Sequence, residues 1–138
     1  MALQDYETAL VTGASSGIGA AVVRALCAAG KKVHAVARRQ DRLDALAAET
    51  GCIPHVLDLR DQAALYDTLG ALDVDILINN AGLGRGFEDF PTTPAADIDV
   101  TIQVNVLAAL HVVRACVGGM KERQRGHIFN IGSVAGLY

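Results

Sequence analysis

A glycine-rich run directly after a short apolar segment constrains this sequence more than any other feature. The run Thr12-Gly13-Ala14-Ser15-Ser16-Gly17-Ile18-Gly19 follows Ala9-Leu10-Val11 and precedes a segment with a helical pattern. Glycines at such a strand-to-helix turn let the backbone bend tightly and approach a pyrophosphate, which no Cβ then blocks. The helix N-terminus adds free N–H groups and a partial positive charge. The run therefore predicts a dinucleotide site, although any βα turn can use glycine and the triplet alone is a weak signal.

The rest of the chain alternates short apolar runs with longer segments of helical pattern. The predicted strands are Thr8–Val11, Lys32–Ala37, Ile53–Leu57, Asp75–Asn79 and His127–Ile131. The predicted helices are Gly17–Ala29, Asp41–Thr50, Asp61–Leu69 and Pro94–Met120. The spacing of Ile18, Val22 and Leu26 predicts the buried face of the first helix. Because strands separated by helices form right-handed βαβ units, we expect one α/β domain over residues 1–138, with a parallel sheet and ligands beyond the carboxyl ends of its strands.

The composition narrows the classes of partner. With 51% hydrophobic residues and a mean hydropathy of +0.31, the chain is apolar enough for a sheet that is covered on both faces. A net charge of −3 and a pI near 5.7 argue against nucleic acid or a membrane surface as partner. The cysteines Cys27, Cys52 and Cys116 lack CxxC spacing and predict buried thiols in a reducing compartment. The four histidines are scattered without ligand spacing, so no metal site is predicted.

Two segments bear on localisation. The N-terminal segment Met1–Glu7 is polar and acidic, unlike a signal peptide. The most apolar window, Val104–Val117, is interrupted by Asn105, His111 and Arg114. It falls short of the roughly 20 clean apolar residues that a membrane span requires. We therefore expect a cytoplasmic protein that does not enter a membrane.

A second motif follows the predicted strand Asp75–Asn79. In Asn79-Asn80-Ala81-Gly82, the asparagine side chains can bind neighbouring backbone groups, and Ala-Gly lets a ligand lie close to the backbone. Alone, such a strand end is more simply interpreted as a turn. Together, the two motifs resemble those of the short-chain dehydrogenase/reductase family, in its shorter, non-extended branch. The resemblance covers essentially the whole chain.

The resemblance implies a Rossmann-like, doubly wound parallel sheet with strand order 3-2-1-4-5. It also implies that Asp58 holds the adenine ring, that Asn105 is a catalytic asparagine, and that Ser133, within Ile131–Gly136, is the catalytic serine. Each residue has a purely structural alternative: Asp58 can cap the turn before the next helix, Asn105 can be a paired amide in a buried helix, and Ser133 can be a turn serine. An unpaired amide in an apolar window is costly, which favours ordered water or a backbone carbonyl as a partner of Asn105.

The charge at the end of the second strand favours NADP(H) over NAD(H). Sites that prefer NAD place a carboxylate there for the ribose 2′-hydroxyl. Here the strand ends Val36-Ala37-Arg38-Arg39, with no acid before Asp41. A guanidinium binds a 2′-phosphate through charge-assisted hydrogen bonds, so Arg38 is the leading contact and Arg39 the second. The alternative is a solvated arginine pair near Asp41 or Asp44. The candidate cofactor-binding residues are Gly13, Ser15, Ser16, Gly17, Ile18, Gly19, Arg38, Arg39, Asp58, Leu59, Asn80, Ala81 and Gly82.

The family resemblance also implies a proton donor, a tyrosine followed four residues later by a lysine, a little over a dozen residues beyond the serine. The sequence has no such pair: Tyr6 and Tyr66 lack the lysine, Tyr138 lies too close to Ser133, and the last lysine is Lys121. The family's sixth and seventh strands and a helix of its dimer interface are missing as well. We expect the sequence to be part of a longer enzyme or a deliberate fragment, with a natural short form as the third explanation.

Two classes of function follow from these observations. The first is an NADP(H)-dependent oxidoreductase that reduces a small carbonyl compound or oxidises an alcohol, using a tyrosine and a lysine beyond these 138 residues and assembling as a homodimer or homotetramer. The 138 residues alone are then expected to be inactive. The second class is a non-catalytic dinucleotide-binding or interaction module.

Overall fold

The structure is a computed structural model, and it describes residues 2–84 and 89–134. The strands are β1 (Thr8–Thr12), β2 (Lys32–Ala37), β3 (Ile53–Val56), β4 (Ile76–Asn79) and β5 (His127–Asn130). The helices are α1 (Gly17–Ala28), α2 (Gln40–Thr50), α3 (Gln62–Leu69), α4 (Ala95–Ile102) and α5 (Ala109–Glu122). Short 3-10 turns occupy Leu3–Asp5 and Phe90–Thr92, and a π-helical turn, Gln103–Ala108, joins α4 to α5.

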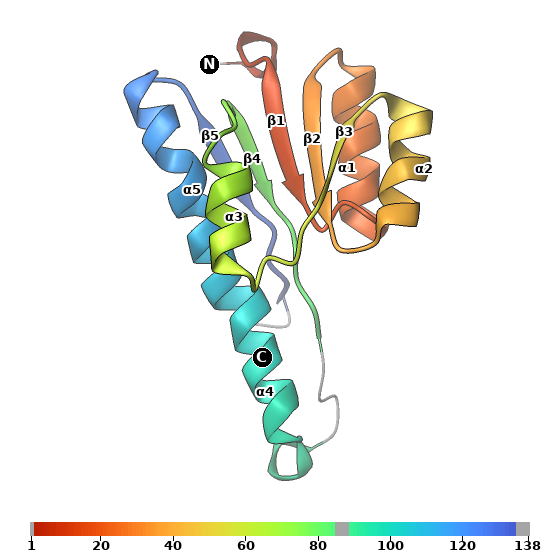
Figure 1. The fold of residues 1–138 in the computed structure, drawn as a ribbon, viewed down its shortest axis with the longest axis vertical. Coiled ribbons are helices and arrows are strands. Elements are labelled where there is room, and N and C mark those ends of the chain that lie inside the picture. Colours follow the sequence, from red (N-terminus) through yellow and green to blue (C-terminus); the bar gives the residue numbers. More distant parts are fainter. Residues whose placement is uncertain (1, 85–88, 135–138) are drawn as a thin grey trace.

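The five strands form one parallel sheet in the order β3-β2-β1-β4-β5, which confirms the predicted topology (Figure 1). Hydrogen bonding places Leu10 of β1 beside His34 of β2 and Leu77 of β4. The predicted strand bounds were close, but Asp75 lies just before β4, and β1 continues to Thr12. Each crossover carries a helix, so all five strands point their carboxyl ends toward the same edge of the sheet.

Helices cover the two faces of the sheet as separate layers. Figure 1 shows α1 and α2 on one face, and α3 and the long α4–α5 segment on the other. On the first face, Val23, Leu26 and Leu43 pack against β1 and β2. On the second face, Leu65 and Val112 pack against the central strands. Two hydrophobic cores therefore hold the sheet rigid between them.

The buried face of α1 differs from the predicted one. Val23 and Leu26 are buried, but Ile18 is 61% exposed. Ile18 lies in the first turn of α1, at the carboxyl end of β1, where no second layer covers it. The prediction was therefore correct for Leu26 and wrong for Ile18.

The predicted long helix exists, but it is not uniform. It runs without a break over Ala95–Glu122, with Pro94 as its N-cap, and ends two residues beyond the predicted Met120. The 28-residue helix has a mean hydropathy of 1.7 in its most apolar window, so by length and composition alone it is long enough to cross a membrane, contrary to the sequence estimate. Val112 and Cys116 nevertheless pack against the sheet.

Strand β5 lies at one edge of the described sheet, as the predicted strand order 3-2-1-4-5 implies. Phe129 and Ile131 are each 43% exposed. The cysteines follow the prediction more closely, because Cys52 and Cys116 are buried and Cys27 is half-buried, all as free thiols. Burial raises the pKa of Cys116 to about 11.

Candidate dinucleotide-binding site

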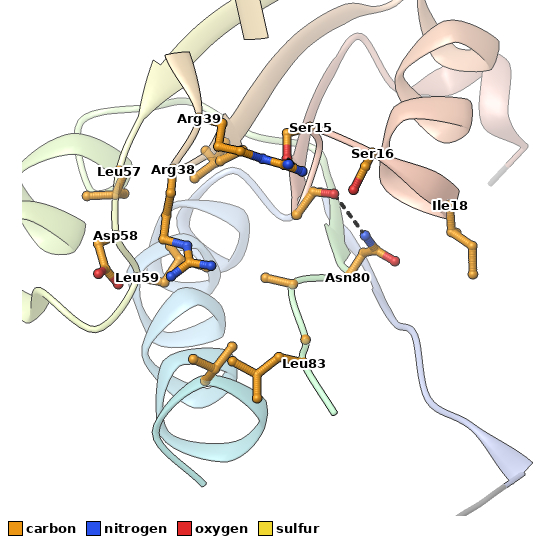
Figure 2. Close-up of a pocket in the computed structure, with 16 residues that line it drawn as sticks. Ser15, Ser16, Ile18, Arg38, Arg39, Leu57, Asp58, Leu59, Asn80 and Leu83 are labelled. Atoms are coloured by element: carbon orange, nitrogen blue, oxygen red, sulfur yellow. Dashed lines mark hydrogen bonds between the residues drawn. The ribbon is translucent and has the colours of Figure 1, made fainter. Parts of the chain in front are cut away.

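A cavity of about 390 Å³ opens beyond the carboxyl ends of β1, β2 and β4 (Figure 2). Its walls come from the glycine-rich turn after β1, the ends of β2 and β3, the residues after β4 and the π-helical turn. The lining residues are Gly13, Ser15, Ser16, Ile18, Val36, Ala37, Arg38, Arg39, Leu57, Asp58, Leu59, Asn80, Ala81, Gly82, Leu83 and Val104. This is the place where open parallel sheets bind their ligands.

The glycine-rich turn packs so tightly against the end of β4 that two of its positions admit no side chain. Gly13 has φ +64°, and a Cβ on it would lie 2.9 Å from the Ala81 Cα. A Cβ on Gly19 would collide with the carbonyl of Gly13 and lie 2.7 Å from the Asn80 amide nitrogen. The N-cap residue of α1, Ser16, makes no side-chain capping hydrogen bond, so the backbone N–H groups at the start of the helix remain available to an anion.

The side chains of Thr12 and Asn80 fix the geometry of this end of the sheet. Thr12 is fully buried, and its Oγ1 accepts hydrogen bonds from the backbone N–H groups of Asn80, at 3.0 Å, and Ala81, at 2.9 Å. In return, the Asn80 side-chain amide donates to the carbonyls of Thr12, at 3.1 Å, and Gly13, at 3.3 Å. Figure 2 marks one of these hydrogen bonds with a dashed line from Asn80 to the glycine-rich turn. These four hydrogen bonds hold the turn after β1 against the turn after β4, so the Asn80 amide has a structural role whether or not it touches a ligand.

Two arginines, Arg38 and Arg39, directly follow β2 and line the cavity. Arg39 Nη2 donates to Ser15 Oγ across 3.4 Å, a long hydrogen bond that spans the mouth of the glycine turn. Arg38 has no hydrogen bond or ion pair with any residue in 2–84 or 89–134. Figure 2 shows its guanidinium pointing into the cavity on the side of Asp58 and Leu59. A cation without a partner, beside a helix N-terminus, suits a phosphate ligand.

Asp58 follows β3, and its carboxylate is already engaged. Arg60 donates to Asp58 Oδ2 from Nη2 at 2.7 Å and to Asp58 Oδ1 from Nε at 3.1 Å. These hydrogen bonds lower the pKa of Asp58, more than its partial burial raises it, and the charge of Arg38 lowers it further. Asp58 Oδ1 also accepts from the backbone N–H of Arg60 at 3.0 Å, so Asp58 caps the turn before α3, as the structural alternative predicted. The N-cap of α3 itself is Asp61, whose side chain accepts from the backbone N–H of Ala64.

Asn105 is exposed, which corrects the expectation of a buried amide, yet it is fully paired. Its Oδ1 accepts from the backbone N–H of Leu83 at 2.8 Å, and its Nδ2 donates to the Leu83 carbonyl at 2.7 Å. The predicted backbone carbonyl partner is therefore present. Asn105 lies in the π-helical turn, a distortion that is frequent at functional sites, and here it carries the amide out to the segment after β4.

Ser133 follows β5 and is exposed, and it does not line the 390 Å³ cavity. Asn79, at the end of β4, ties this region to the long helix by donating to Ala109 O and to Asn130 Oδ1, each at 3.1 Å. Tyr138, which the sequence excluded as a proton donor, lies outside the described residues. Among the described residues, no group of three or more His, Cys, Asp or Glu side chains could hold a metal ion.

The structure thus brings most of the candidate cofactor-binding residues into one cavity. Gly17 and Gly19 are the two that do not line it: Gly17 opens α1, and Gly19 lies beneath the turn. Sequence reasoning missed the apolar walls, namely Val36, Ala37, Leu57, Leu83 and Val104. Their position at strand ends could have indicated the first three, but no sequence signal pointed to Val104.

A family model described as short chain dehydrogenase matches residues 7–138. An uncharacterized short-chain type dehydrogenase/reductase of Sinorhizobium fredii is 42% identical over 135 residues, 98% of this chain and 54% of that protein. An NADP-dependent 3-hydroxy acid dehydrogenase of Escherichia coli is 41% identical over 136 residues, 94% of this chain and 55% of that protein. The chain therefore spans about half the length of these curated relatives.

Solved structures give the same result. Serine dehydrogenase from Escherichia coli superposes with a TM-score of 0.90 at 40% identity, covering 95% of this chain and 64% of that one. A closed form of serine dehydrogenase complexed with NADP⁺ gives a TM-score of 0.91 at 40% identity, covering 95% and 56%. The glycine turn, the Asn-Asn-Ala-Gly segment, the sheet order and these matches agree: the chain belongs to the short-chain dehydrogenase family.

Proposed function

We propose that this chain is the cofactor-binding part of an NADP(H)-dependent oxidoreductase that interconverts a small carbonyl compound and its alcohol. The observation that carries the proposal is the cavity beyond β1, β2 and β4, with Arg38 unpartnered among the described residues at its wall. Membership of the short-chain dehydrogenase family supports the oxidoreductase class. The names of two similar proteins, an NADP-dependent dehydrogenase and a dehydrogenase complexed with NADP⁺, support the choice of cofactor.

The residues present fit the cofactor. Gly13 and Gly19 leave a cradle that a Cβ would fill, and the start of α1 presents N–H groups to a pyrophosphate. Arg38, with Arg39 behind it, would take the ribose 2′-phosphate. Asp58 and Leu59 would flank the adenine. When bound, the cofactor supplies hydride from its nicotinamide ring.

The residues beyond β4 and β5 would act on the substrate side. The Asn105 side chain accepts from the backbone N–H of Leu83 and donates to its carbonyl, and so holds the segment that follows Gly82 in place. Ser133 would orient the substrate carbonyl by donating a hydrogen bond from its hydroxyl. The proton on the developing alcohol would come from a tyrosine with a neighbouring lysine, which the family resemblance expects beyond Ser133 and which these 138 residues do not contain.

A cofactor-exchange experiment tests the proposal. Replacing Arg38→Asp puts a carboxylate where the 2′-phosphate would lie, so the ratio of NADPH to NADH affinity is expected to fall about a hundredfold. Arg42→Asp is the matched control, because Arg42 is exposed on α2 and does not line the cavity. The affinities are measured from nucleotide fluorescence on binding. An unchanged ratio in Arg38→Asp would reject the assignment of Arg38.

Turnover separates the two classes of function. NADPH oxidation with a panel of carbonyl compounds by the full-length protein would support the oxidoreductase, whereas tight NADPH binding with no turnover of any of them would support a non-catalytic binding module. We further propose that the full-length protein is a cytoplasmic homodimer or homotetramer. Exposed apolar side chains along α4 and α5, such as Ile102 and Leu110, support such an assembly.

A further inference from the structure

Arg60 holds the Asp58 carboxylate by both oxygens through a contact that is local in sequence. Besides the 2.7 Å bond from Nη2 to Oδ2, Arg60 Nε lies 3.1 Å from Oδ1 and 3.2 Å from Oδ2. The backbone N–H of Arg60 also donates to Oδ1 at 3.0 Å. A fork that engages a carboxylate at both oxygens has a defined direction as well as strength, and two residues of separation make it easy to close.

The pair lies at the boundary between two cavities. Asp58 lines the candidate cofactor cavity together with Arg38. Arg60 lines a neighbouring cavity of about 200 Å³, between the start of α3 and the π-helical turn, and is not part of the cofactor cavity wall. Arg60 therefore reaches Asp58 from outside the cofactor cavity. Arg38 points into the cavity on the side of Asp58 (Figure 2).

Two guanidinium groups consequently compete for one carboxylate. The positive charge of Arg38 acts on Asp58 electrostatically, since it contributes to the lowered pKa of that carboxyl. Yet Arg38 makes no hydrogen bond or ion pair within the part of the chain that the structure describes, whereas Arg60 engages both oxygens of Asp58. Without Arg60, Asp58 would carry an uncompensated negative charge beside the place proposed for the 2′-phosphate, and Arg38, whose charge already acts on Asp58, would be available to pair with it.

We propose that Arg60 is a positioning residue that sets the preference for the 2′-phosphorylated cofactor. It neutralises and orients Asp58 from outside the cavity, which leaves Arg38 free to bind the 2′-phosphate. This inference rests on the proposed NADP(H) function, and it assigns that preference to the triad Arg38–Asp58–Arg60 rather than to Arg38 alone.

The first test is Arg60→Ala. Arg38 is then expected to pair with Asp58, and the ratio of NADPH to NADH affinity to fall about tenfold. Because adenine is common to both nucleotides, the ratio cancels any effect on adenine binding. Arg24→Ala is the matched control: it removes the same charge and breaks a comparable exposed pair, with Glu49 at 2.7 Å, outside the cavity. Arg60→Lys, which keeps the charge without the fork, is expected to restore part of the ratio.

Double variants show whether Arg60 acts through its neighbours. Asp58→Asn combined with Arg60→Ala is expected to recover the wild-type ratio, because the competing carboxylate is gone. In an Arg38→Ala background, Arg60→Ala is expected to leave the ratio unchanged. A tenfold loss that persists in both backgrounds would overturn the proposal and make Arg60 a direct phosphate contact.

A nucleotide-free measurement separates this inference from the proposed function. The Asp58 carboxyl can be titrated by carbon NMR in Arg60→Ala and in Arg60→Ala/Arg38→Ala. If Arg38 takes over the carboxylate, the second replacement raises the pKa of Asp58 measurably above its value in the single variant. Equal pKa values would overturn the proposal. A raised pKa in a protein that binds NADPH and NADH equally would instead reject the proposed NADP(H) preference, and with it the role of the triad.

Discussion

At the carboxyl end of the sheet Arg38 has no hydrogen bond or ion pair among the described residues, whereas at the amino end a buried carboxylate is held by several donors. There, Asp75 is only 7% exposed and its Oδ2 accepts from the backbone N–H groups of Glu7, at 2.8 Å, and Thr8, at 3.1 Å. The Arg125 guanidinium lies 3.2 Å from the same oxygen. Through these hydrogen bonds, Asp75 holds the start of β1 beside the start of β4.

The electrostatics of the two ends differ accordingly. Burial by itself raises the pKa of Asp75, but the hydrogen bonds from Glu7 and Thr8 and the charges of Arg125 and Arg123 outweigh it, and the pKa lies below its usual value. A carboxylate held in this way contributes to folding stability. At the carboxyl end, the start of α1 and the exposed Arg38 guanidinium face water rather than protein partners among the described residues, so they remain available to a ligand. Charged groups at the amino end of the sheet therefore stabilise the fold, whereas those at the carboxyl end remain available to bind a ligand.

The largest effect that would test this contrast is expected from Gly19→Ala. The new methyl group would collide with the Gly13 carbonyl and push the glycine turn away from Asn80. Nucleotide affinity is expected to fall at least a hundredfold, since the anion cradle is lost. Isothermal calorimetry measures it. The control is Gly118→Ala, where a Cβ on α5 meets nothing within 4 Å and affinity should not change. Wild-type affinity in Gly19→Ala would show that the turn is not the cradle.

The next largest effect is expected from Asp75→Asn, at the amino end. The amide keeps an oxygen but loses the charge that Arg125 and the two backbone N–H groups face, so the free energy of unfolding is expected to fall by about 3 kcal/mol. Urea denaturation measures it. The affinity of the folded protein for nucleotide should stay within twofold, because the two ends are separate. If the binding free energy fell by as much as the free energy of unfolding, the two ends of the sheet would not be independent.

The smallest effect is a pH dependence of stability from His34, in the buried middle of β2. Burial, then the neighbouring His55 and Lys32, lower the pKa of His34 from 6.5 to about 4. Between these values the unfolded chain binds a proton that the folded protein does not. Stability should therefore fall as pH drops from about 6.5 toward about 4, by about 2 kcal/mol in all.

His34→Leu is expected to flatten this part of the pH profile, as measured by urea denaturation at several pH values. His34 Nδ1 lies 2.9 Å from His55 Nε2, so His55→Leu serves to separate the contribution of the pair from that of burial. If the slope between pH 6.5 and 4 survives in His34→Leu, the titration belongs to another group. Nucleotide affinity measured at neutral pH should be the same in both variants.

Much of the fold was predictable because its causes are local. The alternation of apolar runs and helical patterns placed every strand of the sheet to within a residue or two at each end. The prediction was wrong at Ile18, since helical spacing cannot tell where the second layer of the sandwich ends. It was wrong again about the surroundings of Asn105, because an apolar window in the sequence does not reveal that the neighbouring side chains stay exposed.

Some residues of the candidate site could likewise be predicted from the sequence, and others could not. Gly13 and Arg38 carry their signal in the sequence, because a tight βα turn and a cation after the second strand are properties of a few adjacent residues. Val104 and Leu83 reach the cavity only because the π-helical turn lies against the segment after β4. The roles of Ser133 and Asn105 in catalysis stay predictions.

The sequence by itself determined a parallel α/β sheet with an anion cradle after its first strand, since strand and helix periodicity and the freedom of glycine act over short distances. Only the tertiary structure decided which charges remain available. The sequence ranked Arg38 before Arg39 by its place after the second strand, but it did not show which of Arg38, Arg39 and Arg60 pairs with another side chain. The fold turns Arg60 onto Asp58 and Arg39 toward Ser15, and leaves Arg38 facing the cavity. The pairing of Arg60 with Asp58 is local, but the positions of Arg39 near Ser15 and of Arg38 beside Asp58 depend on distances between segments. Those distances exist only once the ends of β1, β2 and β3 lie side by side.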